Sequence, residues 1–455
     1  MGNEKNNTEA QARRVMKLAW VMFLIISLAG FFTQFHRTSS GVIRGDLAAD
    51  FEMGATAFSL FSSMYFYPYV IMQLPYGIMC DKWGVRKTVS LATIIAAIGT
   101  AIFAAAPNFS ILCLGRALVG VGVAAPVVAT QKLTASWFKQ GQIVTVGGFG
   151  SLIGMLGGIC AQAPLALVVA AFTWRATFYG LAVLTVAMAL ICIFFLKDSP
   201  ESIGLPSIKE LEGNAASAEQ KAEPVAEEEQ KSVIQVLKGV FTNRYCWSLF
   251  IMAPIMQGAY IVFSGTWGVS YLMDTFGYDS IKASTLTAYV AIGMSISNFA
   301  IALISDMLKS RKKPLVFIAA LTFAEWFLLA YGQGFLAKIG FAGQGVVMFL
   351  FGCTAAAVPM LFAVCREVND RRYVGMSIST VNTIGMLSAA FMPVIVGAVI
   401  DNNMKTLSGG ALYTKSFGFI VILAGIALVA SIFSKETHAK YVEPKYGKTK
   451  KEGKE

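Results

Sequence analysis

Residues 62–90 read SSMYFYPYVIMQLPYGIMCDKWGVRKTVS, and this stretch decides the fold. An apolar run long enough for a membrane helix leads into a tight charged turn, and a second apolar run begins directly after it. The turn contains the spaced residues Gly77, Asp81, Lys82, Gly84, Arg86 and Lys87. Glycines permit close helix approach and a sharp bend, and the charged side chains can pair with one another or with helix ends as a latch. A basic loop at the cytoplasmic surface would explain the cations, but neither the aspartate nor the glycine spacing.

The composition is that of a membrane protein. Of 455 residues, 56% are hydrophobic and 14% charged, and the mean hydropathy of +0.63 excludes an ordinary water-soluble domain. The formal charge of +11 does not indicate nucleic acid, because the basic residues lie in short loops and in the C-terminal tail. The seven cysteines lack the spacing of a metal site or a disulfide framework. We therefore expect the lipid bilayer as a partner, and no nucleic acid, metal or cofactor.

Twelve apolar runs of about 20 residues, the length that crosses roughly 30 Å of hydrocarbon, follow one another along the chain. They lie at 18–41, 57–80, 88–106, 109–131, 143–169, 175–196, 246–273, 284–305, 315–334, 341–365, 374–400 and 416–434. We predict an all-α membrane protein with twelve transmembrane helices in two six-helix halves. Its predicted parts are a cytoplasmic tail (1–17), an N-terminal bundle (18–196), a cytoplasmic linker (197–243), a C-terminal bundle (244–434) and a basic cytoplasmic tail (435–455).

The distribution of lysine and arginine predicts the orientation. Alternate connections are rich in these residues, as at 13–17, 82–87 and 309–313, whereas the opposite connections carry few. By the positive-inside rule, both termini face the cytoplasm. We expect a multi-pass protein of the cytoplasmic (inner) membrane that acts as a monomer. The linker sequence ELEGNAASAEQKAEPVAEEEQK is too small and charged to bury a core.

The charged turn resembles the signature loop between the second and third helices of the major facilitator superfamily. A degraded second copy lies between the eighth and ninth runs, where Asp306 and Arg311 keep the spacing of Asp81 and Arg86. Ala302 stands where the first copy has a glycine, so the second latch is the weaker prediction. The resemblance implies a transporter that rocks two related halves around a site near the middle of the bilayer.

Two arginines lie inside apolar runs, where a charge costs roughly 2.5 to 3.5 kcal/mol and normally faces a cavity or a partner. Arg37 lies in the outer part of the first run and Arg116 within the fourth. In facilitator architecture these two helices line the cavity, so both guanidinium groups could converge on one anion. Two alternatives stay open. Arg37 could reach the outer membrane interface, and Arg116 could be the structural partner of a polar group on the first or second helix.

Three segments sharpen the resemblance within the superfamily. The sequences QFHR (34–37), LGRALVG (114–120) and SWF (136–138) resemble motifs of the anion:cation symporter family. Members of that family carry organic anions, including sugar acids and other carboxylates, and often couple uptake to protons or sodium. The resemblance implies that Arg37 and Arg116 clamp the substrate.

The chain departs from that family at two positions. His36 stands where many members have an aspartate, and the apolar segment 122–126 stands where many have a glutamate. Two usual proton-handling carboxylates are therefore missing. His36 could titrate in their place, because an unperturbed imidazole changes charge near pH 6.5, or it could only donate a hydrogen bond. Exchange of one anion for another is then an alternative to coupling with H+ or Na+.

Aromatic and amide side chains complete the candidate substrate site. Tyr65 and Tyr69 are four residues apart and share a helix face. Tyr69 is the stronger candidate of the two, and aromatic packing is the alternative for both. The second half contributes Gln257, Tyr260, Trp267 and Asn382. An amide such as that of Asn382 can both donate to and accept from a substrate, with interhelical hydrogen bonding as the alternative.

These observations predict secondary active transport of a small organic anion, of the carboxylate type or a sulfonate, by alternating access. Proton- or sodium-coupled uptake is the first interpretation. An anion exchanger, an exporter of lipophilic compounds and a non-transporting sensor are alternatives, although the mainly cationic intramembrane charges disfavour the exporter. We expect no enzyme, because no nucleophile and base constellation occurs. Glu325, the carboxylate deep in the ninth run, is interpreted as structural or interfacial.

Overall fold

The computed structural model describes residues 2–139, 142–208, 210, 233–355, 357–369, 374–438 and 442. Every regular element in these residues is a helix. The chain forms two compact units: unit 1 comprises residues 1–46 and 64–226, and unit 2 comprises residues 47–63 and 227–455. The segment 47–63 therefore belongs to unit 2, although its neighbours on both sides along the chain belong to unit 1.

The helices account for all the predicted membrane spans. Nine helices among the described residues are long and apolar enough to cross a bilayer, and the bent pair 146–160 and 163–172 makes a tenth. The span predicted at 57–80 is divided into two helices, and the span predicted at 284–305 lies within α15, whose 28 residues extend about 42 Å. The predicted all-α membrane fold is therefore confirmed, whereas the predicted domain boundaries stay predictions.

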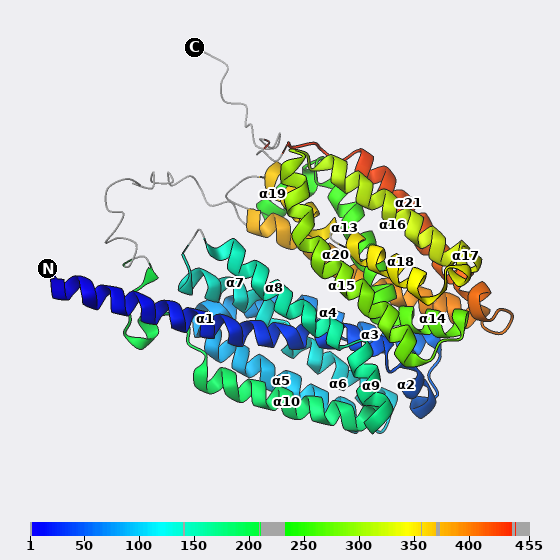
Figure 1. Cartoon of the computed structure of the whole chain (residues 1–455), viewed down its shortest axis with the longest axis horizontal. Helices are drawn as coiled ribbons and strands as arrows, with labels where there is room; N and C mark the ends of the chain where they lie inside the picture. The colour runs from blue at the N-terminus through cyan, green and yellow to red at the C-terminus, as the bar shows by residue number, and fades with distance from the viewer. Residues whose placement is uncertain are drawn as a thin grey trace, which may run out of the picture. The chain divides into compact units, whose positions relative to one another are not determined.

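Unit 1 is a bundle of long apolar helices (Figure 1). Its elements are α1 (Gly2–Thr38), η1 (Ser39–Gly41), α4 (Phe66–Trp83), α5 (Val85–Ala105), α6 (Phe109–Gly122), α7 (Ala125–Trp137), α8 (Ile143–Cys160), α9 (Ala163–Phe172), α10 (Trp174–Phe195) and η3 (Glu201–Ile203), and α2 (Arg44–Phe51) crosses the boundary between the units. Helix α5 packs against both α6 and α10, and α1 packs along α8. Phe23, Val89 and Trp137, from three different helices, share one buried apolar cluster.

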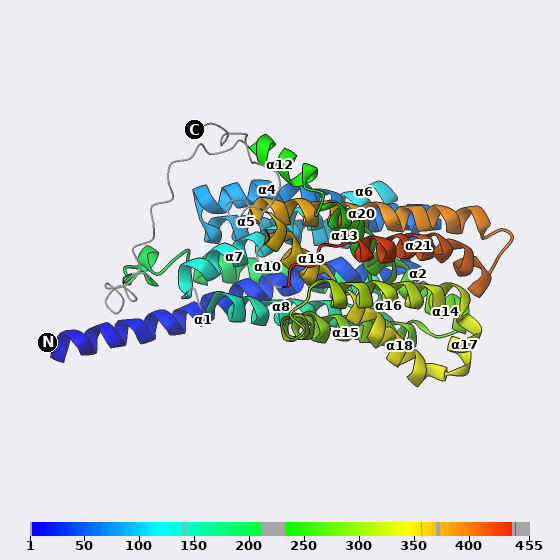
Figure 2. The same cartoon turned by 90° about the horizontal axis from the view of Figure 1, so that it is seen from above.

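Unit 2 pairs its helices in the same manner, with α15 on α18, α13 on α20 and α16 on α21 (Figure 2). Its elements are α3 (Ala55–Ser63), α12 (Val233–Thr242), α13 (Trp247–Ile261), the π-helical η4 (Val262–Trp267), α14 (Gly268–Phe276), α15 (Ser280–Met307), α16 (Lys312–Tyr331), α17 (Gln333–Lys338), α18 (Gly340–Thr354), α19 (Ala357–Val368), α20 (Val374–Asn403) and α21 (Gly409–Ile432). Leu249, Leu315 and Leu361 lie in one buried apolar cluster, which includes residues of α13, α16 and α19.

Helix α3 is held within unit 2 by α20. The Asp401 carboxylate accepts hydrogen bonds from the N–H groups of Ala55 and Thr56, both at 2.7 Å, and so caps the first turn of α3. At the other end, the Ser63 hydroxyl donates to the Ala390 carbonyl at 2.5 Å. The predicted second span is thus divided between the two units, with its first helix packed on α20.

Candidate functional site

Arg116 lies on α6, which begins where the side-chain oxygen of Asn108 accepts a hydrogen bond from Ile111 N–H at 3.0 Å. The Arg116 side chain is buried, with 2% of its surface exposed. Its Nη2 donates to the His36 carbonyl oxygen at 2.7 Å and to the Ser40 hydroxyl at 3.4 Å. These are the contacts that a structural partner of the first helix would make, and the role in anion binding stays a prediction.

Tyr65 lies beside this guanidinium and links it to the first helix. The ring centroid is 5.2 Å from Arg116 Cζ, a cation–π distance, and the hydroxyl donates to the Thr33 carbonyl at 2.9 Å. The Tyr69 ring stacks on the Tyr65 ring, with centroids 5.7 Å apart and an interplanar angle of 15°. Gly120 permits this approach of α6, because a Cβ there would lie 2.2 Å from the Tyr65 carbonyl oxygen.

Arg37 is half-buried at the end of α1. Its Nη1 donates to Gln34 Oε1 at 3.5 Å, the outer limit of a hydrogen bond, and its buried Nε has no hydrogen-bond partner among the described residues. Both Arg37 and Arg116 lie close enough to Tyr65 to interact electrostatically with it, and Arg37 also interacts with Tyr69. Arg37 and Arg116, from different helices, thus both interact electrostatically with Tyr65.

His36 is 1% exposed and lies next to this cluster. Neither Nδ1 nor Nε2 has a hydrogen-bond partner in the part of the chain that the structure describes. Its backbone carbonyl accepts the hydrogen bond from Arg116, and its ring meets the Phe35 ring edge-on at 6.1 Å. The imidazole therefore retains its hydrogen-bonding capacity, and its role in coupling stays a prediction.

Unit 2 places two of the predicted amides on neighbouring helices. Gln257 on α13 is 5% exposed, and its Nε2 has no hydrogen-bond partner among the described residues. It lies against α20, where a Cβ at Gly385 would be 2.3 Å from Nε2. Asn382 lies three residues before Gly385, on the same side of α20. The half-buried Asn382 side chain also makes no hydrogen bond to a described residue, so both amides have capacity for a polar ligand.

Tyr260 and Trp267 have packing contacts in unit 2. Tyr260 is half-buried, and its carbonyl accepts a hydrogen bond from the Ser264 hydroxyl at 2.8 Å. Trp267 is fully buried at the end of η4, where its Nε1 donates to the Pro393 carbonyl at 3.4 Å. Its ring meets the Phe58 ring edge-on at 5.9 Å. A substrate role for either residue stays a prediction.

Glu325 lies on α16 and is 4% exposed. The Thr354 hydroxyl donates to its Oε2 at 3.2 Å, and Oε1 has no hydrogen-bond partner among the described residues. The contact joins α16 to the last residue of α18. Within the described residues, no group of three or more His, Cys, Asp or Glu side chains could hold a metal ion.

The first charged turn, residues 81–87, is tied to α7 and α10. Lys132 Nζ donates to Asp81 Oδ1 at 2.7 Å and to the Cys80 carbonyl at 2.6 Å. Arg86 does not pair with Asp81; its Nε and Nη2 donate to the Ile193 carbonyl at 2.9 and 2.6 Å, near the end of α10. Of the two predicted modes of pairing, the arginine therefore uses the helix end.

A carboxylate that the sequence analysis did not single out completes this turn. Asp198 Oδ1 accepts a hydrogen bond from Arg86 N–H at 2.8 Å. Gly84 has φ +89°, and a Cβ there would lie 2.6 Å from Asp198 Oδ1, so both the backbone and the carboxylate require glycine. The other predicted glycine, Gly77, is less constrained, since a Cβ would meet only Val128 at 3.9 Å. Lys87 is exposed.

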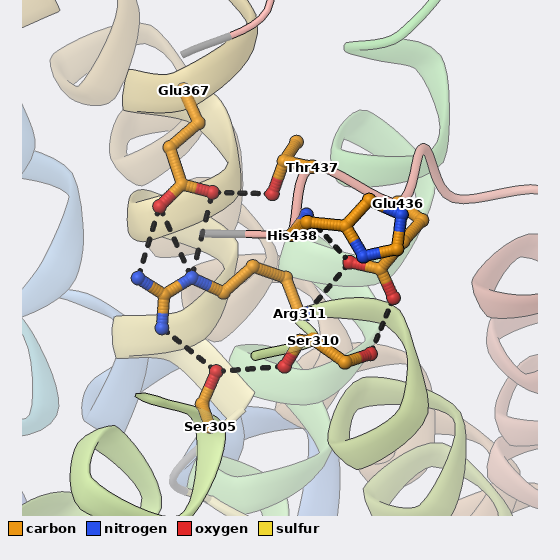
Figure 3. Close-up of polar contacts among 7 residues, drawn as sticks. All are labelled: Ser305, Ser310, Arg311, Glu367, Glu436, Thr437 and His438. Carbon is orange, nitrogen blue, oxygen red and sulfur yellow. Dashed lines mark hydrogen bonds and ion pairs between the residues drawn. The ribbon is translucent and has the colours of Figure 1, made fainter. Parts of the chain in front are cut away.

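The second charged turn, residues 306–312, contains a buried ion pair (Figure 3). Arg311 Nη2 and Nε contact Glu367 Oε1 at 3.0 and 3.1 Å, and Arg311 Nη1 donates to the Ser305 hydroxyl at 2.8 Å. The Thr437 hydroxyl donates to the other oxygen of Glu367. The side chain of Asp306, the predicted counterpart of Asp81, lies outside the described residues. Glu367 on α19 is thus a partner of Arg311 that the sequence analysis missed.

A further carboxylate caps the helix that follows the second turn (Figure 3). Glu436, four residues after the end of α21, accepts hydrogen bonds from Arg311 N–H at 2.9 Å and Lys312 N–H at 3.3 Å, and from the Ser310 hydroxyl. The N-terminus of α16 is therefore held by the segment that follows α21. The spacing of Phe195-Leu-Lys-Asp198 and Phe433-Ser-Lys-Glu436 is the sequence signal that could have found both caps.

Comparisons with known proteins agree with the predicted fold and family. The model of the family described as Major Facilitator Superfamily matches residues 26–393. The hexuronate transporter of Bacillus subtilis (strain 168) is 24% identical over 441 residues, covering 92% of this chain and 96% of the relative. A probable L-galactonate transporter of Escherichia coli (strain K12) is 23% identical, with 92% and 89% covered. A probable sulfoacetate transporter of Cupriavidus necator is 24% identical, with 84% and 86% covered.

Solved structures show the same fold. A bacterial homologue of the human lysosomal transporter Spinster, in an inward-facing conformation, superposes with a TM-score of 0.68 at 15% identity, covering 92% of this chain and 97% of that one. A D-xylose-proton symporter superposes with a TM-score of 0.66 at 12% identity, with 93% and 99% covered.

Proposed function

We propose that this chain, which belongs to the Major Facilitator Superfamily, transports a small organic anion by alternating access. The family and the fold are those of transporters, not of enzymes. The similar proteins named for hexuronate, L-galactonate and sulfoacetate carry acidic cargo, which supports a carboxylate or sulfonate as the cargo of this chain. The observation that carries the proposal is the gathering of Arg37 and Arg116 around Tyr65 within membrane-spanning helices.

Each residue of the proposed site has a distinct task. Arg37, whose Nε has no hydrogen-bond partner among the described residues, supplies the donors that meet the anion first. Arg116 is fixed by the His36 carbonyl and contributes positive potential from a buried position, where water screens it little. Tyr69 and Tyr65 form the aromatic wall beside these charges. For Gln257 and Asn382, which lie in unit 2, a role in binding the cargo stays a prediction.

Coupled uptake with H+ or Na+ is the proposed mode, with His36 as the candidate proton carrier. Its two ring nitrogens lack hydrogen-bond partners among the described residues, and it precedes Arg37 in the sequence, so a proton on the ring would add positive charge beside the proposed anion site. Anion exchange is the second candidate, and it is favoured by the absence of a carboxylate at position 36.

A thermal-shift experiment on the purified full-length protein tests the cargo class. Ligand at 100 times its Kd stabilises the folded protein by about 2.7 kcal/mol. We expect the melting temperature to rise with a hexuronate, L-galactonate or sulfoacetate. It should stay unchanged with the neutral sugars that correspond to the two sugar acids. Equal shifts with acidic and neutral sugars would contradict the proposal.

Variants then test the arginines. In Arg37→Gln we expect affinity for the anion to fall about tenfold or more, the effect of losing charge-assisted hydrogen bonds, with an unchanged melting temperature without ligand. Arg175→Gln is the matched control, because Arg175 donates to the carbonyls of Ala104 and Ala106 at the end of α5 and is not a residue of the proposed site. Counterflow of labelled anion in proteoliposomes separates a transporter from a sensor. An Arg37→Gln variant that binds like the wild type removes Arg37 from the site.

A further inference from the structure

The surface of unit 2 is hollowed between α13 and α21, on the outside of the apolar bundle. The cavity has a volume of about 610 Å³, and its walls include Ile422, Val429 and Phe433, which are 66%, 54% and 79% exposed. Small residues, Gly425 and Ala430, also line it. In a membrane-spanning protein such apolar exposure faces hydrocarbon, so the cavity is shaped for a lipid chain and not for a polar solute.

The interior of the cavity presents little polarity to its occupant. Ser248 is the one neutral polar side chain in its lining, and this hydroxyl is 3.2 Å from the Ser434 hydroxyl, which is itself buried. The two hydroxyl groups satisfy each other. An acyl chain in the cavity therefore desolvates no unpaired hydroxyl at this point.

One cation lines the cavity, and a second lies near it. Arg244 is exposed and is the one charged residue in the lining. Its Cζ lies 5.0 Å from the centroid of the Tyr245 ring, and Lys435 Nζ lies 5.3 Å from the same centroid. Glu436, the carboxylate next to Lys435 in the sequence, accepts hydrogen bonds from backbone N–H groups at the N-terminus of α16. The end of the cavity is thus positively charged.

The elements around these cations have the features of a membrane interface. Trp247, which lines the cavity, is 59% exposed, and tryptophan favours the headgroup level of a bilayer. The preceding helix α12 contacts the bundle through Phe241, whose ring centroid is 5.1 Å from that of Phe250, and carries the exposed Lys238. Short helices with one apolar side and exposed lysines lie in the interface plane.

We propose that this groove is a binding site for an anionic glycerophospholipid. One acyl chain lies in the cavity between α13 and α21, and the phosphate lies between Arg244 and Lys435. The planar fork of arginine suits phosphate oxygens, and the lysine adds a point charge. A zwitterionic lipid would fill the same cavity with its chains, but its own ammonium group would oppose the two cations.

Native mass spectrometry of the full-length protein tests the site. The protein is equilibrated in mixed micelles with equal amounts of phosphatidylglycerol and phosphatidylcholine that carry identical acyl chains. The wild type is expected to retain phosphatidylglycerol preferentially. Arg244→Gln and Lys435→Gln are each expected to lower the ratio of retained phosphatidylglycerol to phosphatidylcholine about fivefold, the effect of roughly 1 kcal/mol for each cation near an anionic headgroup.

Two further variants make the experiment decisive. Lys309→Gln removes one exposed charge from the second charged turn without touching the groove, so it is expected to leave the ratio unchanged. Val429→Trp adds bulk from the exposed wall and is expected to lower retention of both lipids with the cations intact. Equal retention of the two lipids by the wild type overturns the proposal. An equal loss of the preference for phosphatidylglycerol in Lys309→Gln, Arg244→Gln and Lys435→Gln overturns it as well. Lys435→Gln alone decides the matter if Arg244→Gln does not fold.

Discussion

The two charged turns share one feature, a carboxylate that follows a long helix (α10 or α21) and caps another helix. In the first turn Asp198 accepts a hydrogen bond from Arg86 N–H, and in the second Glu436 accepts from Arg311 N–H and Lys312 N–H. Each cap satisfies amide groups that a helix N-terminus leaves without an intrahelical partner. The carboxylate cap is thus repeated in both units, whereas the backbone before the capped helix differs, with φ +89° at Gly84 and −93° at Arg311.

The side-chain ion pairs of the two turns differ in polarity and in burial. In the first turn a carboxylate, Asp81, is bound by Lys132 of α7, with exposed fractions of 75% and 36%. In the second turn a guanidinium, Arg311, is bound by Glu367 of α19, with exposed fractions of 10% and 8%. A pair in water contributes little to stability, whereas breaking a buried pair leaves an uncompensated charge. The difference therefore predicts that the two turns contribute unequally to stability.

Removal of the buried carboxylate is expected to have the largest effect. Glu367→Ala leaves Arg311 buried beside the Ser305 hydroxyl and removes the acceptor of Thr437, at a cost of about 3–5 kcal/mol in the free energy of unfolding. Thermal and denaturant unfolding of the detergent-solubilised protein measure it.

A double variant separates charge from packing. In Arg311→Met with Glu367→Leu no buried charge remains, so most of the lost stability is expected to return. A double variant as unstable as Glu367→Ala would show that the hydrogen bonds, and not the uncompensated charge, dominate. A loss below about 1 kcal/mol in the single variant would remove the contrast between the turns.

The second effect in size is expected in the first turn, and it comes from the backbone. Gly84→Ala forces φ +89° on a residue with a Cβ and places that Cβ against Asp198, so we expect a loss of about 2–3 kcal/mol. Gly180→Ala in α10 is the control, because nothing lies within 4 Å of a Cβ there and alanine favours a helix. Equal melting temperatures for the two variants would contradict the required glycine.

The cap of the second turn predicts a pH dependence. Burial raises the pKa of Glu436, but hydrogen bonds from the Ser310 hydroxyl and three backbone N–H groups outweigh it and hold the pKa at about 2, below its usual value. A lowered pKa means that the charged carboxylate stabilises the folded state above the ordinary pKa of about 4.3, and that this contribution is lost as the pH falls towards 2.

Glu436→Gln tests that dependence. The variant is expected to lose about 1 kcal/mol at pH 7, the usual contribution of a helix cap, and to show a smaller further loss than the wild type between pH 4.5 and 2. Ser207→Ala is a control on a local cap, since the Ser207 hydroxyl accepts a hydrogen bond from Glu210 N–H at 3.0 Å in an exposed turn. Parallel pH curves for wild type and Glu436→Gln would contradict the charged cap.

The sequence predicts the fold more completely than it predicts the contacts that stabilise the fold. Apolar runs and charged turns specify membrane helices because hydrocarbon leaves the backbone no other hydrogen-bond partner. The break of the second span at residues 64–65 also has a sequence cause. Pro68 lacks the N–H that would donate to the carbonyl of Met64, so the helix is interrupted one turn before the proline.

The partners of the predicted charges could not be predicted, because they depend on small rotations of helices that are far apart in the sequence. Arg116 donates to the His36 backbone carbonyl, a group that every residue has. Arg311 is paired with Glu367 of α19, 56 residues further along the chain. The two carboxylate caps do have a signal in the sequence, the Phe-x-Lys-acid pattern at the ends of α10 and α21.

The smallest effect is expected at the exposed pair. Asp81→Asn removes a carboxylate that is 75% exposed, and Lys132 keeps the Cys80 carbonyl at 2.6 Å as an acceptor. Solvent screens such a pair, so the free energy of unfolding should change by less than about 0.5 kcal/mol, and 0.5 M salt should remove even that difference. Counterflow in proteoliposomes supplies the second readout, because a latch that only sets the balance of conformations changes the rate of transport without changing stability. A loss of 2 kcal/mol or more would place stability in the exposed turn and reverse the comparison, since burial would then not decide which pair holds its unit together.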